Sequence, residues 1–383
     1  MYRSEENQSM IGTYGDWAAS LHTNSIPKLS FRNEGISDLE TWKKEARAKV
    51  LELLRFSEMK TFSELRVESS HEFEGLHVEE LSWQLPYGPR TRATYLRPIN
   101  FSGKLRGVLA LHDHSGIKYF GRRKIIRTKE GLHPMMEELQ NRSYGGKAWA
   151  NELAKRGYAV LVPDVYSFGS RRVLLKDVPN RIKGNLKDPK DSDLEGIKAY
   201  NSWAGNHESI NAKSLFSAGT SWPALTFYED QQALDVLASR AEVDENRLGC
   251  GGLSGGGLRT VMLSGLDDRI KSAVSVGFMT TWQDFLLHKS HTHTWMIYIP
   301  GLPQFLEFPE IMALRAPLAS LVLSNTNDPL FTLAEMERAD RIMKEVYAKA
   351  NAADKYRASF YPGGHKFDQS MQVEAFEWFD RFL

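Results

Sequence analysis

The 383-residue sequence lacks several features that would direct a search for function. It has one cysteine, Cys250, so it cannot form an internal disulfide and gives no sign of an oxidising compartment. The 49 basic and 48 acidic residues nearly cancel, so no net field favours nucleic acid or a membrane surface. No apolar run reaches the roughly 18 residues of a membrane span, and residues 1–10 lack the pattern of a signal peptide. These absences predict a cytoplasmic protein without a nucleic-acid or membrane partner, and they leave a homo-oligomer open.

Short, nearly continuous apolar runs alternate with helical patterns along most of the chain. Such runs are typical of strands buried on both faces of a parallel sheet. The first two runs are joined by a turn rich in proline and glycine, which indicates an antiparallel pair at the start. The sequence therefore predicts a three-layer α/β fold with a mostly parallel, eight-stranded sheet flanked by helices. The expected strands are residues 76–85, 91–96, 107–111, 158–162, 247–251, 272–276, 318–323 and 356–361.

Two segments depart from this rhythm. Residues 1–65 are expected to form an N-terminal helical extension, because residues 39–54 (LETWKKEARAKVLELL) repeat apolar side chains at helical spacing. Residues 66–383 are expected to form the main domain. Within it, residues 166–223 are too long for an ordinary connection, which favours a functional insertion. We interpret that insertion as a lid or cap over the strand ends.

The strongest chemical signal is the glycine-rich stretch around Ser254. Gly252-Leu253-Ser254-Gly255-Gly256 follows an expected strand and precedes a helical pattern, LRTVML. This is the G-x-S-x-G pattern of a nucleophile elbow, in which a serine lies on a strained strand-to-helix turn and its neighbours must be small. The alternative is a glycine-rich turn in which the serine only caps the helix. We predict that Ser254 is a catalytic nucleophile.

A serine hydroxyl needs a base, and the base needs an orienting acid. The carboxyl ends of parallel strands meet at one edge of the sheet, so both groups are sought there. Asp328 follows the seventh expected strand, and His365 follows the eighth after a Gly-Gly turn. We predict Asp328 as the acid and His365 as the base. Glu310 and Asp340 are weaker alternatives for the acid because neither follows a strand directly.

Backbone N–H groups are the expected donors to an oxyanion. One is that of Gly255, directly after the serine, and the other comes from the loop after the third expected strand. We choose His114 there, with Asp113 and Ser115 as near competitors. A metal site is not expected, because His112 and His114 lack further ligands at a useful spacing. The histidines at 288, 291 and 293 are expected in a loop that edges the pocket, and Cys250 is expected to be a buried structural thiol.

The stretches 244–268, 316–331 and 360–367 (FYPGGHKF) resemble the α/β-hydrolase group that includes acetyl xylan esterases and dienelactone hydrolase-like proteins. The resemblance covers roughly residues 70–383. It implies an α/β-hydrolase fold, a triad of Ser254, Asp328 and His365, and the cleavage of small acyl esters, often acetyl groups on sugars, without a cofactor. Two positions depart from the group's pattern. Asp113 stands where a glycine usually follows the histidine, and Gly255 stands where glutamine is common.

The leading prediction is a serine carboxylic ester hydrolase that acts on a small-molecule ester through an acyl-enzyme. Two alternatives remain: a serine peptidase of the prolyl oligopeptidase type, and a non-catalytic binding module with the same fold. The sequence does not identify the natural substrate. Trp203, Trp282 and Trp295 are the candidate pocket residues, since indole rings offer stacking surfaces for a sugar, although they equally suit a core.

Overall fold

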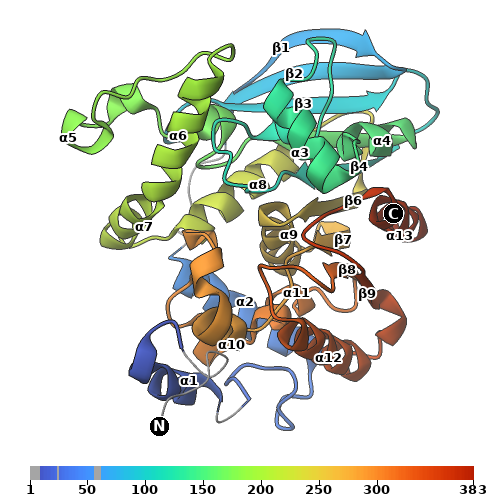
Figure 1. Ribbon diagram of the computed structural model, residues 1–383. Coiled ribbons are helices and arrows are strands. Elements are labelled where there is room, and N and C mark those ends of the chain that lie inside the picture. The colour runs from blue at the N-terminus through green and yellow to red at the C-terminus, as the bar shows by residue number, and fades with distance from the viewer. Residues whose placement is uncertain (1–8, 24–25, 56–61) are drawn as a thin grey trace.

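One sheet organises the part of the chain that the computed structural model describes, residues 9–23, 26–55 and 62–383. Within those residues the sheet has nine strands in the order β1-β2-β3-β5-β4-β6-β7-β8-β9 (Figure 1). The strands are β1 (Ser63–Phe73), β2 (Leu76–Gln84), β3 (Thr91–Pro98), β4 (Leu105–Leu111), β5 (Tyr158–Pro163), β6 (Val243–Leu253), β7 (Ile270–Val276), β8 (Ala319–Asn325) and β9 (Tyr356–Tyr361).

The sheet joins an antiparallel end to a parallel body. β1, β2, β3 and β5 pair antiparallel in that order, whereas β5, β4, β6, β7, β8 and β9 are parallel. The expected α/β fold and all eight expected strands are confirmed. The expected count is one too low, because it omitted β1, which begins at Ser63 and crosses the boundary expected after residue 65. β1 lies at the sheet edge and is mostly exposed, so its sequence carries no apolar run to reveal it.

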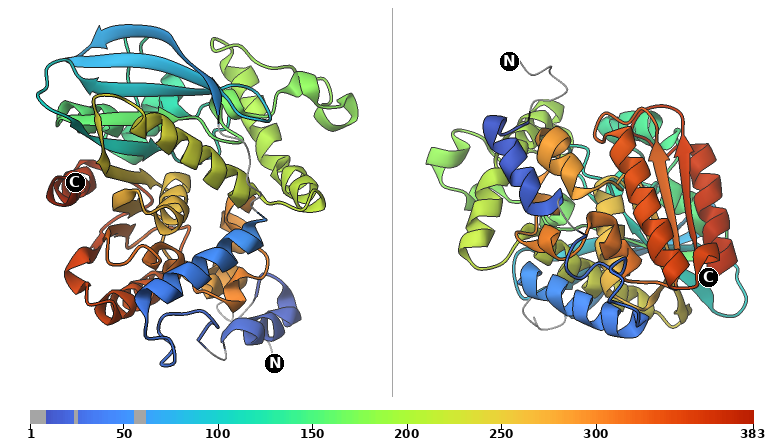
Figure 2. Two further views of the ribbon diagram at one scale, coloured as in Figure 1. Left: turned by 180° about the vertical axis from the view of Figure 1, so that it is seen from behind. Right: turned by 90° about the horizontal axis from the view of Figure 1, so that it is seen from below.

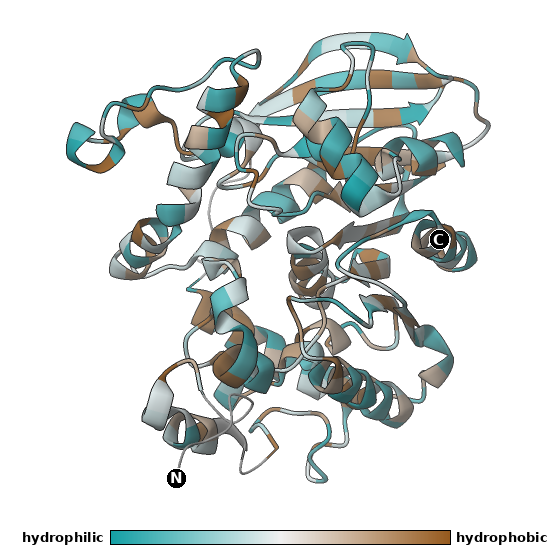
Figure 3. Ribbon diagram, viewed as in Figure 1, coloured by the Kyte–Doolittle hydropathy of each residue, from teal (hydrophilic) through white to brown (hydrophobic). Residues whose placement is uncertain are grey.

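Helices cover both faces of the sheet and form two apolar cores, one on each face (Figures 1 and 2). α2, α8, α9, α11 and α12 contribute to one core, and α3, α4, α6 and α13 contribute to the other. Hydrophilic residues are prominent on the outward surfaces of α3 and α12 (Figure 3). The helices are α1 (Gly15–Thr23), α2 (Leu39–Leu54), α3 (Pro134–Tyr144), α4 (Trp149–Lys155), α5 (Asn180–Lys183), α6 (Leu194–Asn206), α7 (Glu208–Ser217), α8 (Trp222–Ala238), α9 (Gly255–Leu266), α10 (Trp282–Asp284), α11 (Phe308–Ala313), α12 (Leu333–Lys349) and α13 (Gln369–Phe382).

The N-terminal helices pack against the outside of this body. α2 has the bounds expected from the sequence. Asp38 caps its N-terminus, because its side chain accepts a hydrogen bond from the Thr41 N–H. Arg47 joins α2 to the end of α9 by donating to the Gly265 carbonyl at 2.9 Å and pairing with Asp268. α2 crosses behind the lower half of the molecule in Figure 1 and in front of it in the turned view of Figure 2.

The insertion at residues 166–223 contains short helices rather than an irregular loop. α5, α6 and α7 form a projection beside the sheet, and α7 leads toward the strand ends (Figure 1). His207 separates α6 from α7, so the chain turns there and presents Glu208 at the start of α7. Among the described residues, no helix combines the length and apolar character needed to cross a bilayer.

Candidate active site

Ser254 lies on the sharp turn between β6 and α9. Its backbone has φ 59° and ψ −119°, in the left-handed region that disfavours a residue with a side chain. The turn is held from both sides, because the Ser254 N–H donates to the Val276 carbonyl at 2.8 Å and its carbonyl accepts from the Leu258 N–H at 2.9 Å. Such strain persists only where the surroundings enforce it, which is the defining property of a nucleophile elbow.

The flanking glycines explain the spacing of the motif. A Cβ atom on Gly252 would lie 2.1 Å from the carbonyl oxygen of Leu111, the last residue of β4. A Cβ atom on Gly256 would lie 2.1 Å from the same oxygen. Neither position can therefore hold a side chain without moving β4. The two glycines let the turn come close to the neighbouring strand, as the motif requires.

His365 and Asp328 meet at the same edge of the sheet. Asp328 follows β8, His365 follows β9, and the His365 Nδ1 lies 2.6 Å from the Asp328 Oδ2. The other Asp328 oxygen, Oδ1, accepts a hydrogen bond from the Leu330 N–H at 2.9 Å, and the carboxylate is fully buried. This arrangement fixes the orientation of the imidazole and leaves its Nε2 for another partner. Among the described residues, Nε2 is a buried nitrogen without a hydrogen-bond partner.

Ser254 and His365 line one cleft of about 360 Å³. A Cβ atom on Gly277, just after β7, would lie 3.0 Å from the His365 Cε1 and 3.1 Å from the Leu253 Cδ1. The imidazole thus lies beside the residue that precedes the serine. The alternative acids lie elsewhere: Glu310 is on α11 and accepts from Ser30, and Asp340 is on α12 and accepts from the Tyr356 hydroxyl at 3.0 Å.

The two expected oxyanion donors are neighbours. A Cβ atom on Gly255 would lie 3.0 Å from the backbone nitrogen of His114, and both residues line the cleft. A larger residue at 255 would therefore push against the loop that follows β4. This contact favours a small residue at position 255.

A buried lysine holds that loop in place. The Lys124 Nζ donates to the carbonyl oxygens of Asp113 and His114, at 2.7 and 2.8 Å. Burial lowers the pKa of Lys124 to about 8. The Tyr144 hydroxyl also donates to the Asp113 side chain. Asp113 is therefore part of a buried network that fixes the loop.

The insertion at residues 166–223 adds a carboxylate, that of Glu208, to the cleft. The Glu208 Oε1 lies 2.7 Å from both the His114 Nε2 and the Lys118 Nζ. Burial acts to raise the pKa of Glu208, but the hydrogen bonds and charges of His114 and Lys118 outweigh it and lower the pKa to about 2. Sequence reasoning missed Glu208, Lys118 and Lys124, because they are isolated charged residues outside any motif.

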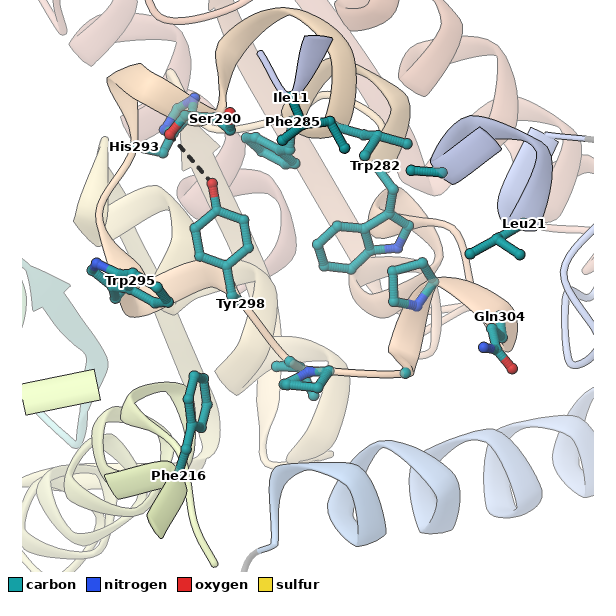
Figure 4. Close-up of a pocket in the computed structure, with 16 residues that line it drawn as sticks. Ile11, Leu21, Phe216, Trp282, Phe285, Ser290, His293, Trp295, Tyr298 and Gln304 are labelled. Carbon is teal, nitrogen blue, oxygen red and sulfur yellow. Dashed lines mark hydrogen bonds between the residues drawn. The ribbon is translucent and has the colours of Figure 1, made fainter. Parts of the chain in front are cut away.

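The three candidate tryptophans lie away from this cleft. Trp203 stacks on His207 within the insertion, with ring centroids 4.5 Å apart. Trp282 and Trp295 line a second cavity of about 730 Å³ (Figure 4). Of the histidines expected at the pocket edge, His291 and His293 line the cleft.

Cys250 and possible metal ligands were also considered from the sequence. Cys250 is buried within β6, and burial raises the pKa of its thiol to about 12, so it stays protonated at ordinary pH. Within the part of the chain that the structure describes, no group of three or more histidine, cysteine, aspartate or glutamate side chains is arranged to hold a metal ion.

The sheet order, the elbow after β6 and the position of the histidine after β9 define the α/β-hydrolase fold, as the sequence predicted. Solved structures with the same fold agree. An acetyl xylan esterase candidate from Bacteroides fragilis NCTC 9343 superposes with a TM-score of 0.67 at 19% identity, covering 94% of this chain and 84% of that one. A promiscuous CE15 esterase from a marine bacterial metagenome gives 0.61 at 14% identity, covering 95% and 98%.

Sequence comparisons point to the same group of folds. Residues 215–333 match the model of the prolyl oligopeptidase family, a span that includes Ser254 and Asp328 and stops before His365. The hydrolase candidate YtaP of Bacillus subtilis (strain 168) is 27% identical over 309 residues, which cover 80% of this chain and 88% of that protein.

Proposed function

We propose that this protein is a serine carboxylic ester hydrolase. The observation that carries the proposal is the constellation at the strand ends: a strained serine, and an imidazole paired with a buried carboxylate at 2.6 Å, both on one cleft. The fold shared with several esterases supports the same class of reaction.

The proposed reaction passes through an acyl-enzyme. The Ser254 hydroxyl attacks the ester carbonyl while the His365 Nε2 takes its proton, and Asp328 stabilises the imidazolium. The N–H groups of Gly255 and His114 donate to the oxyanion of the tetrahedral intermediate. His365 then gives the proton to the departing alcohol. Water repeats the attack, with His365 again acting as the base, and releases the acid.

We further propose small, acetyl-type acyl groups as substrates, with a carbohydrate as one candidate for the alcohol. The name of one solved structure, an acetyl xylan esterase candidate, supports this choice. Glucuronoyl esterases are also among the similar structures, and their name places the sugar in the acyl part of the ester instead. Peptide hydrolysis is the second candidate, favoured by the match to the prolyl oligopeptidase family model over residues 215–333.

Hydrolysis of p-nitrophenyl acetate by the wild type and by Ser254→Ala tests the proposal. We expect the variant to lose at least about a thousandfold in kcat/KM and to lose labelling by a fluorophosphonate, while its circular dichroism is unchanged. Retention of more than about a hundredth of the activity would contradict the role of Ser254. Faster turnover of a proline-containing peptide p-nitroanilide than of any ester would favour the peptidase instead.

A further inference from the structure

The second cavity, of about 730 Å³, is a built apolar site beside the cleft. Its volume falls within the range of about 300–1,000 Å³ that is typical of small-molecule sites. Three separate parts of the chain enclose it: α1, the segment 282–304 and the end of α7. Figure 4 shows the rings of Trp282, Tyr298 and Trp295 around the space, with Phe216 and Leu21 on two further sides.

This cavity and the catalytic cleft share a wall. His293 lines both, and the segment 290–295 divides its other residues between them: Ser290 and Trp295 line the apolar cavity, whereas residues 291, 292 and 294 line the cleft. The wall is completed by two phenylalanine rings. Phe278 on the cleft side and Phe285 on the apolar side have ring centroids 5.6 and 4.8 Å from that of His293.

The lining decides what kind of group this space can hold. The Trp282 indole N–H donates to the Leu306 carbonyl at 2.9 Å, and the Tyr298 hydroxyl points to the Ser290 carbonyl at 3.4 Å (Figure 4). Both donors are thus engaged by the protein, and the remaining polar side chains of the lining, among them Ser290 and Gln304, are few beside its aromatic and aliphatic ones. Such a lining offers a sugar few partners for its several hydroxyl groups, whereas an alkyl or aryl group would gain about fourfold in binding for each methylene removed from water.

We propose that the cavity binds the apolar group of an ester whose carbonyl lies at Ser254. This inference rests on the proposed function and narrows its substrate class. Because the acyl part is proposed to be small, the apolar group belongs to the alcohol, which is then an alkyl or aryl alcohol rather than a sugar. The segment 290–295 and the rings packed on His293 lie between the two spaces, so the proposal also requires that this segment move aside to admit the ester to both.

Leu21 offers a way to alter the cavity without touching the cleft. It lies on α1, lines the cavity and is 60% exposed, so an arginine there is tolerated by the fold and adds charge at the apolar site. Val373→Arg is the matched control, because Val373 is an exposed apolar residue of α13, at 51%, and lines neither space. Ala18→Phe is a second variant, which fills the cavity from the same helix.

The experiment compares kcat/KM along two ester series and one polar ester. Methyl, butyl and octyl acetate lengthen the alcohol, p-nitrophenyl acetate, butyrate and octanoate lengthen the acyl group, and acetylated xylose is the polar ester. We expect the wild type to prefer octyl over methyl acetate by at least about tenfold. Leu21→Arg and Ala18→Phe should lower that preference about fivefold or more and leave kcat/KM for methyl acetate within about twofold, and Val373→Arg should change neither.

Binding of 1-octanol, followed by tryptophan fluorescence in Ser254→Ala and in Ser254→Ala combined with Leu21→Arg, separates the two hypotheses. Weaker binding in the double variant supports the apolar site even if the wild type cleaves no ester. A wild type that cleaves no ester would overturn the proposed function alone. Hydrolysis of p-nitrophenyl acetate with a flat alcohol series would overturn the inference and leave the proposed function standing. A preference for acetylated xylose, or one confined to the acyl series, would overturn the assignment of an apolar alcohol.

Discussion

The two cavities differ in nearly every property although one wall separates them. The cleft of Ser254 is lined by a paired imidazole, by the Glu208 carboxylate and by Gly255 and His114. The neighbouring cavity is lined mainly by aromatic and aliphatic side chains. Its volume is about twice that of the cleft, at about 730 against about 360 Å³.

On our proposal, the cleft breaks the ester bond and the neighbouring cavity recognises the apolar group of the substrate. Charge development in a transition state requires oriented donors and charges, which the strand ends supply with fixed geometry. Recognition of an apolar group requires only shape and exclusion of water, which loops and an added helix supply without precise polar contacts. Changes in the cleft should therefore alter rates for all esters alike, whereas changes in the apolar cavity should alter the preference among esters.

Asp328→Asn should produce the largest effect on the cleft. The carboxylate accepts from both the His365 ring and the Leu330 N–H, so an amide would present a donor to one of them and favour the wrong tautomer of the imidazole. We expect kcat to fall by roughly 10⁴-fold for short and long alcohols alike. Asp340→Asn is the matched control, and we expect it to keep nearly full activity. A fall that is much steeper for one chain length would contradict the separation of the two sites.

Gly255→Ala should produce a smaller loss through the oxyanion donors. The added Cβ atom would approach the His114 nitrogen to 3.0 Å and displace one donor from the other. Loss of a single donor typically costs 10²–10³-fold in kcat, and partial displacement should cost about 10- to 100-fold. Gly35→Ala serves as the control, because a Cβ atom there meets nothing within 4 Å. An unchanged kcat in Gly255→Ala would argue that His114 does not donate to the oxyanion.

His293→Gln tests how the histidine in the shared wall makes the stability of the protein depend on pH. Burial lowers the pKa of His293 to about 4, below the usual value of about 6.5, so the unfolded chain binds the proton first as pH falls. Stability from the neutral ring is therefore complete above about pH 6.5 and is lost as pH falls to about 4, by up to about 3 kcal/mol. Glutamine keeps a donor for the Leu330 carbonyl but does not ionise. Urea unfolding at pH 7 and pH 4.5 should show a smaller loss in the variant, and equal losses would contradict this account.

Most of the parallel body of the sheet was predictable because β4, β5, β7 and β8 are buried along nearly their whole length. Each of these strands carries a short apolar run, and such runs record burial directly in the sequence, whereas the edge strand β9 is only partly buried. β1 was missed because an exposed edge strand needs no apolar residues. The helices of the insertion were missed because its many charged residues obscure the pattern, although α6 buries Ile197, Tyr200 and Ala204 at helical spacing.

The candidate site likewise has residues that the sequence predicted and residues that it did not. Ser254, Asp328 and His365 follow strands directly, so counting strands was enough to bring them together at one edge. Gly255 and His114 were reachable by the same count. Glu208 and the tryptophans belong to insertions, whose positions depend on packing between segments far apart in the chain. No local pattern encodes that packing, so the tryptophans were assigned to the catalytic pocket although two of them line its neighbour.

The first helix of the chain has a consequence for how selectivity can diverge among related proteins. α1 encloses the apolar cavity but contributes nothing to the sheet, the elbow or the His–Asp pair. Residues 15–23 can therefore accumulate substitutions, or be exchanged between homologues, with the catalytic apparatus left intact. Exchange of this helix would alter the proposed preference for the alcohol without altering the triad. Laboratory evolution aimed at new alcohols should therefore begin there instead of at the triad.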